Sequence, residues 1–207
     1  MPLTRREFLG RAAAALALPR VAVVHPALAA PRVACTILDL GDDCTLSESL
    51  AGYRMTLANA APRVPVLVVP AALELPREAI GRHLGAGGMV VLESGAAFGS
   101  EHALTRWRNS LRRYLGIRIA APVPLSSGRV PYVDFTWPQR ALVRDFSVVV
   151  PVVGQQGEII ATAQGLPVAL RRHTSQGTLV FLGSPIGPAL WAGDVEARRW
   201  ILGVLAS

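Results

Sequence analysis

The chain of 207 residues contains no lysine, few charged side chains and few aromatic ones. All 21 basic residues are arginine, charged residues make up 17% of the chain, and aromatic residues make up 6%. Proteins that bind nucleic acid normally mix both basic residue types and interleave them with aromatic side chains. The formal charge of +7 therefore does not indicate a nucleic-acid partner, and we attribute the arginine bias to a GC-rich coding sequence.

Long hydrophobic runs and metal-binding patterns are missing as well. No segment reaches the roughly 20 apolar residues that a membrane-spanning helix needs, so we expect no membrane span in the mature chain. The four histidines and two cysteines are not spaced as metal ligands, and the glycines lack the spacing of a nucleotide-binding loop. The sequence therefore predicts no metal site and identifies no cofactor.

The first thirty residues resemble a twin-arginine export signal. The motif is a paired arginine inside a short pattern: Thr4, Arg5, Arg6, Glu7, Phe8 and Leu9. An apolar run over 12–18 and a small-x-small triplet at 27–29 follow, as in cleaved signal peptides. The resemblance implies twin-arginine export machinery as a partner, cleavage near Ala29, and a periplasmic or extracellular location.

Removal of residues 1–29 would leave one domain, residues 30–207, with 17 arginines against 13 acidic residues and a formal charge of +4. Two cysteines, Cys35 and Cys44, remain in it. An oxidising compartment would allow them to pair. The alternative is a buried thiol at Cys35, because a strand between the two positions can carry their Cα atoms beyond the roughly 7 Å limit for a disulfide.

Apolar runs alternate with amphipathic segments up to residue 115. We expect strands over 33–40, 64–70 and 89–92, and helices over 46–57, 76–84 and 100–115. This alternation favours a parallel, doubly wound sheet. After Gly116 the pattern changes to short segments bounded by Gly or Pro, which predict further strands over 117–125, 132–137, 147–153, 158–163, 168–172 and 178–182. A last helix is expected over 194–205.

Two pairs of segments resemble a class I glutamine amidotransferase-like domain. They are 66–70 with 87–95, and 165–172 with 177–185. The resemblance implies an α/β fold of the flavodoxin-like or amidotransferase-like kind, a three-layer sandwich with a mostly parallel central sheet and extra β-strands in the C-terminal half. In that family the first pair carries the nucleophile and the second delivers the catalytic base.

The residues at the family's catalytic positions differ here. Ser94 stands where the family has its cysteine, and Ser184, Pro185 and Ile186 stand where it has His-Pro-Glu. The resemblance therefore implies a pseudoenzyme: an exported, non-catalytic binding or accessory module whose partner is an envelope protein or a small ligand. The alternative is a serine hydrolase in which Ser94 is activated by His102, with Glu93 or Asp42 orienting the base.

Ligands of doubly wound folds bind at the carboxyl ends of the parallel strands. Six polar residues follow predicted strands or precede the last helix and form the candidate binding crevice: Asp42, Asp43, Glu93, Ser94, Ser184 and Asp194. The aromatic segment 131–138 is a second candidate surface, with Tyr132, Asp134 and Thr136 expected on one face and the apolar side chains on the other. We expect the arginines of helix 100–115 to be solvated surface rather than an anion site.

Overall fold

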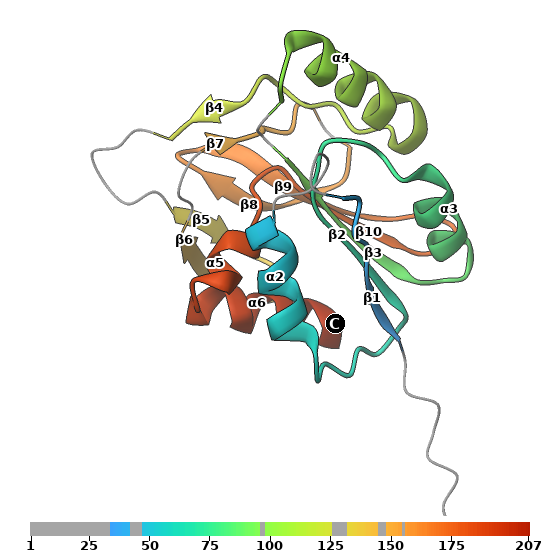
Figure 1. Ribbon diagram of the computed structural model, residues 1–207, viewed down its shortest axis with the longest axis vertical. Coiled ribbons are helices and arrows are strands. Elements are labelled where there is room, and N and C mark those ends of the chain that lie inside the picture. The colour runs from blue at the N-terminus through green and yellow to red at the C-terminus, as the bar shows by residue number, and fades with distance from the viewer. Residues whose placement is uncertain (1–33, 42–46, 96–97, 126–131, 145–147, 155) are drawn as a thin grey trace, which may run out of the picture. The chain divides into compact units, whose positions relative to one another are not determined.

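The computed structural model describes residues 34–41, 47–95, 98–125, 132–144, 148–154 and 156–207. Strands and helices alternate in the first half of the described chain (Figure 1). They are β1 (Cys35–Ile37), α2 (Ser47–Leu57), β2 (Val66–Ala72), α3 (Arg77–Gly85), β3 (Met89–Ser94), α4 (Glu101–Ser110) and the π-helical turn η1 (Leu111–Leu115). The predicted order of elements up to residue 115 is confirmed.

The second half is mostly β-structure and ends in two helices. Its elements are β4 (Val123–Pro124), β5 (Tyr132–Phe135), β6 (Ala141–Arg144), β7 (Val148–Val149), β8 (Glu158–Ala163), β9 (Leu166–His173), β10 (Thr178–Leu182), α5 (Gly187–Trp191) and α6 (Val195–Ala206). The strand predicted over 117–125 is reduced to β4 and an isolated bridge between Ile119 and Val152. β6 and α5 were not predicted. Within the described ranges, no helix is both long enough and apolar enough to cross a membrane.

In the part of the chain that the structure describes, eight strands form one mixed sheet in the order β1-β2-β3-β10-β9-β8-β5-β6. β1, β2, β3 and β10 are parallel neighbours, and the remaining four pairings are antiparallel. The prediction of a flavodoxin-like or amidotransferase-like three-layer sandwich with a mostly parallel sheet is therefore wrong. Short turns join β8, β9 and β10, and strands joined in this way must run antiparallel.

The turn between β8 and β9 shows how local sequence sets this pairing. Gln164 and Gly165 both have positive φ, 50° and 81°, as the two central residues of a type I′ hairpin turn do. The turn brings Leu166 back opposite Ala163. A two-residue connection leaves no room for a crossover helix, so the C-terminal half extends the sheet by antiparallel hairpins.

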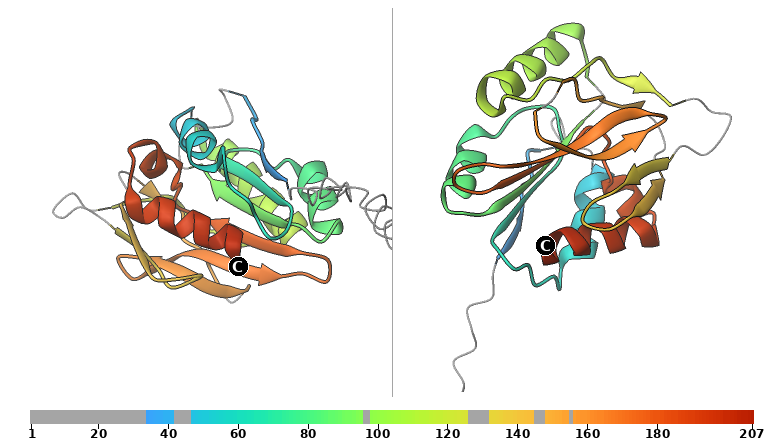
Figure 2. Two further views of the ribbon diagram at one scale, coloured as in Figure 1. Left: turned by 90° about the horizontal axis from the view of Figure 1, so that it is seen from below. Right: turned by 180° about the vertical axis from the view of Figure 1, so that it is seen from behind.

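Side chains of the central strands alternate between two apolar clusters. Val66 and Val68 of β2 pack with α2, α5 and α6, whereas Leu67 and Val69 pack with α3 and α4. Figures 1 and 2 show α2, α5 and α6 gathered on one side of the strands, with α3 and α4 apart from them. In the first cluster the rings of Phe135 and Trp200 lie 4.2 Å apart, centroid to centroid, which ties α6 to β5.

Helices α2 and α5 approach each other at two glycines. A Cβ atom on Gly52 would lie 2.2 Å from the carbonyl oxygen of Gly187, and one on Gly187 would lie 2.4 Å from the Cα of Ser49. Real Cβ atoms do not come that close to backbone atoms, so any larger residue would push the helices apart. The two glycines therefore fix the position of α5 relative to α2.

We expect Gly52→Ala to lower the free energy of unfolding by about 1 to 3 kcal/mol, because the new methyl group meets backbone that cannot move aside. Gly81→Ala is the matched control: Gly81 is also helical, in α3, and a Cβ atom added to it would have no neighbour within 4 Å. Alanine is the better helix former, so the control is expected to gain about 0.5 to 1 kcal/mol. Urea denaturation measures both, and equal effects would contradict the close approach.

Candidate functional site

Glu93 lies near the end of β3 and is completely buried. Its carboxylate accepts four hydrogen bonds from three other parts of the chain. Oε1 accepts from the Tyr53 hydroxyl at 2.6 Å and from the backbone N–H groups of Ile186 at 2.8 Å and Gly187 at 3.3 Å. Oε2 accepts from the backbone N–H of Ala71 at 3.1 Å. Both oxygens are therefore engaged inside the protein.

The backbone of β2 is irregular where it meets this carboxylate. The pairing of β2 with β3 shifts register between Val69 and Ala72, and Ala71 has a positive φ of 38°, which is uncommon for a residue other than glycine. The irregularity releases the N–H of Ala71 from the strand ladder and lets it donate to Glu93. The irregular backbone at Ala71 thus makes its N–H group available as one of the four donors to Glu93.

Burial raises the pKa of Glu93 to about 7, and the hydrogen bonds from Tyr53, Ile186, Ala71 and Gly187 act in the opposite direction. Removal from water disfavours the charged carboxylate, whereas donors that point at it stabilise the charge. Burial also raises the pKa of the Tyr53 hydroxyl, and the negative charge of Glu93 raises it further. Tyr53 therefore remains a donor.

Ser94 is fully buried beside Glu93. Its hydroxyl donates to the carbonyl of Gly95 at 3.0 Å and accepts from Nε1 of Trp107 at 2.9 Å. His102 is exposed on α4 and lies five residues before Trp107, which is about 140° around a helix with 3.6 residues per turn. Since Trp107 points toward Ser94, His102 points elsewhere.

The expected hydrolase triad is therefore not assembled among the described residues. Ser94, His102 and Glu93 come from adjoining parts of the sequence, but the partners of Ser94 are Gly95 and Trp107. The described residues that donate to Glu93 include no histidine. A serine hydroxyl without a neighbouring base is a weak nucleophile.

Three of the six residues predicted to form the binding crevice lie at the same edge of the sheet. Ser184 follows β10, whose Leu182 pairs with Glu93, so Glu93, Ser94 and Ser184 share the carboxyl edge of the sheet, and all three are buried. Asp194 lies elsewhere: it accepts a hydrogen bond from the N–H of Ala197 at 3.0 Å and caps α6.

Several predicted residues lie outside the described part of the chain: Arg5, Arg6, Phe8, Leu9, Asp42, Asp43 and Cys44. Cys35 is half-buried in β1 without a disulfide among the described residues, and burial raises the pKa of its thiol. The described residues contain no group of three or more histidine, cysteine or carboxylate side chains that could hold a metal ion.

The aromatic segment behaves as its alternation predicts. Val133 and Phe135 of β5 are buried, whereas Tyr132 and Thr136 are exposed. Tyr132 and Leu142 line a shallow hollow with Asp194. The prediction of one core face and one outer face is confirmed for these four residues, whereas Asp134, expected on the outer face, and Trp137, expected on the core face, are both half-buried.

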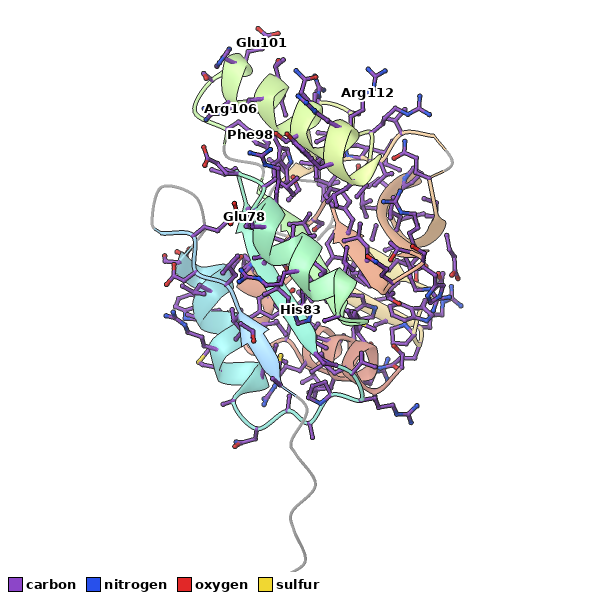
Figure 3. All side chains as sticks on the ribbon, turned by 90° about the vertical axis from the view of Figure 1, so that its right-hand side faces the viewer. Glu78, His83, Phe98, Glu101, Arg106 and Arg112 are labelled. Atoms are coloured by element: carbon purple, nitrogen blue, oxygen red, sulfur yellow. The ribbon has the colours of Figure 1, made fainter. Side chains whose placement is uncertain are left out.

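An open groove, which the sequence did not identify as a site, lies between α4 and the segment that joins β2 to α3. It encloses about 490 Å³ and is lined by apolar, aromatic and basic side chains, among them Leu73, Leu75, Arg77, Arg106, Arg113 and Tyr114. A second hollow of about 660 Å³ shares Leu75, Arg77 and Tyr114 with it. Figure 3 views this side of the molecule, with Arg106 labelled on α4 and Glu78 on α3.

No protein-family model and no curated protein matches the chain. Solved structures show similarity in fold. A beta-galactosidase from Bacillus circulans sp. alkalophilus matches with a TM-score of 0.55 and 15% identity over 81% of this chain and 30% of that chain. An exo-beta-1,4-mannosidase from Opitutaceae bacterium strain TAV5 matches with a TM-score of 0.54 and 14% identity over 78% and 32%. The chain thus spans about a third of the length of these glycosidases.

A third similar structure is a cytoplasmic protein from Salmonella typhimurium LT2, with a TM-score of 0.53 and 12% identity over 82% of this chain and 89% of that chain. The resemblance to class I glutamine amidotransferases, and with it the interpretation of the chain as a pseudoenzyme of that family, is corrected by these matches, because two of the three similar structures named are glycosidases and none is an amidotransferase. The segments that suggested the family, 66–70 and 87–95, are aliphatic strands that end in small residues, and such strands recur on many α/β folds.

The raised pKa of Glu93 predicts a pH-dependent stability. Between the ordinary value of 4.5 and about 7 the folded state binds more protons than the unfolded state, so the free energy of unfolding falls as the pH rises through this window. The contribution is fully present below pH 4.5 and is lost above about 7. A shift of this size corresponds to a loss on the order of 3 kcal/mol.

Glu93→Gln removes the titrating proton and serves as the reference. Urea denaturation at pH 5 and pH 8 measures wild type and variant, and subtraction cancels the other titrating groups. We expect wild type to lose stability relative to Glu93→Gln between these two pH values. A difference that does not change with pH, or that changes in favour of wild type, would contradict the raised pKa.

Proposed function

We propose that the protein is an exported, non-catalytic module that binds a ligand or partner in the cell envelope. The single observation that supports the non-catalytic part is that Glu93 and Ser94, at the carboxyl edge of the sheet, are buried away from solvent. Glu93 accepts four internal hydrogen bonds, and the Ser94 hydroxyl both donates and accepts one. Groups that are buried and satisfied in this way have no access to a substrate.

Glycoside hydrolysis, which the names of two similar structures indicate for those proteins, requires two carboxyl groups on either side of an open site. Glu93 is closed off from solvent, and Glu74 on the groove is paired with Arg106 at 3.2 Å. We therefore do not propose this activity for the chain. A binding function agrees better than glycoside hydrolysis with an open groove that lies beside a buried carboxyl edge of the sheet.

The export part of the proposal rests on the resemblance of residues 4–9 to a twin-arginine signal. Fractionation of the producing cells tests it. A mature protein that begins near Ala30 and is found outside the cytoplasm would support export, whereas full-length protein confined to the cytoplasm would overturn it.

A fluorophosphonate probe, which labels activated serines, tests the non-catalytic part. We expect wild type and Ser94→Ala to be equally unlabelled, because the Ser94 hydroxyl is buried and contacts no histidine. A serine hydrolase labelled in parallel is the positive control. Labelling of wild type that disappears in Ser94→Ala would overturn the proposal in favour of a hydrolase.

A further inference from the structure

One face of α4 and its continuation η1 presents six polar side chains to the groove, each of which can donate a hydrogen bond. The residues follow one another at spacings of three and one, as one side of a helix requires, and all of them line the 490 Å³ cavity: His102, Thr105, Arg106, Asn109, Ser110 and Arg113. None is acidic. Trp107 and Leu111 of the same elements pack in the buried cluster, with Trp107 also reaching the floor of the groove, and this packing fixes the orientation of the polar face.

Two guanidinium groups meet at one aromatic ring in this groove. The Arg77 guanidinium lies 4.4 Å from the centre of the Tyr114 ring and donates to the Tyr114 hydroxyl, and the Arg113 guanidinium lies 5.5 Å from the same ring. Among the described residues, no acidic side chain forms an ion pair with either arginine. Both guanidinium groups thus lie within 5.5 Å of one ring centre, and an anion bound in the groove would balance their charge.

A third arginine in the groove has a weakly held partner. Arg106 pairs with Glu74 at 3.2 Å, and about 60% of each side chain is exposed. Exposed ion pairs contribute little to stability, so a ligand can displace Glu74 at small cost. Among the described residues that line the groove, Glu74 is the single acid against Arg77, Arg106 and Arg113.

We propose that this groove binds a small soluble molecule with two or more oxyanion groups, such as a polycarboxylate or a sugar bisphosphate. Guanidinium groups bind carboxylate and phosphate through paired hydrogen bonds. The volume of about 490 Å³ lies in the usual range of small-molecule sites, and a single carboxylate fills little of it. The inference deepens the proposed function by naming the ligand class of the module.

The arginines of helix 100–115 were expected to be solvated surface, and Arg106, Arg112 and Arg113 are all exposed. Arg112 is exposed and does not line the groove, whereas its neighbour Arg113 does. Leu73, Leu75 and Arg77 form the wall of the groove that Arg113 also lines and Arg112 does not. The chain therefore supplies its own matched control for the charge at Arg113.

Isothermal titration of the full chain with citrate and with fructose 1,6-bisphosphate tests the proposal. We expect both to bind, and acetate to bind at least about tenfold more weakly, because it engages one arginine cluster only. The double variant Arg77→Gln with Arg113→Gln is expected to lose about tenfold or more in citrate affinity, since hydrogen bonds to charged groups are lost. Arg112→Gln is expected to change the affinity by less than about twofold, because Arg112 does not line the groove and its charge is screened by water and salt.

Asn109→Asp is a second variant that leaves the Tyr114 cluster intact and places a negative charge on the polar face. We expect it to weaken citrate binding even if the double variant folds poorly. Wild-type affinity in a folded Asn109→Asp protein would contradict the assigned site. An equal loss in Arg112→Gln would show general charge attraction and would overturn the proposal.

Vesicles of phosphatidylglycerol separate a lipid headgroup from a soluble ligand. Binding to vesicles without binding to citrate or fructose 1,6-bisphosphate would overturn the soluble ligand class. Binding of none of the probes would overturn the site itself. Either result leaves the serine-probe experiment unchanged, so failure of this inference is distinguishable from failure of the proposed function.

Discussion

The Glu93 carboxylate joins segments that are far apart in the chain. Its donors come from α2, from the end of β2 and from the start of α5. A carboxylate without partners in such a place would be very costly to bury, so the fold must bring all the donors together at once. The close contact of α2 with α5 at Gly52 and Gly187 depends on the same arrangement, because Gly187 both donates to Glu93 and packs against α2.

Ser94, the residue next to Glu93, links the buried carboxyl edge of the sheet to helix α4. Ser94 accepts a hydrogen bond from Trp107 of α4, so the end of β3 holds the buried side of that helix. Arg106, about 100° around the helix from Trp107, then faces the open groove between α4 and the segment that joins β2 to α3. A closed interior at the carboxyl edge and an open basic groove beside it are thus two results of one packing arrangement.

Local pattern was enough to predict much of the secondary structure. The strands over 158–163 and 178–182 have the predicted bounds, since an apolar run between turn residues is a local signal. The pairing of strands is not local, so the mixed sheet could not be deduced from 33–115 alone, and the short elements β6 and α5 left too weak a pattern. Glu93 was named from the sequence, but three of its donors are backbone N–H groups, as much as 94 residues away, which no side-chain motif reveals.

The most direct test of this account is the titration of the Glu93 side-chain carboxyl carbon by ¹³C NMR, with Glu93→Gln to assign the signal. The account predicts a midpoint near 7, because burial outweighs the four donors. A midpoint at or below the ordinary value of about 4.5 would contradict it, since the carboxylate would then be either open to water or stabilised by its donors more than burial destabilises it.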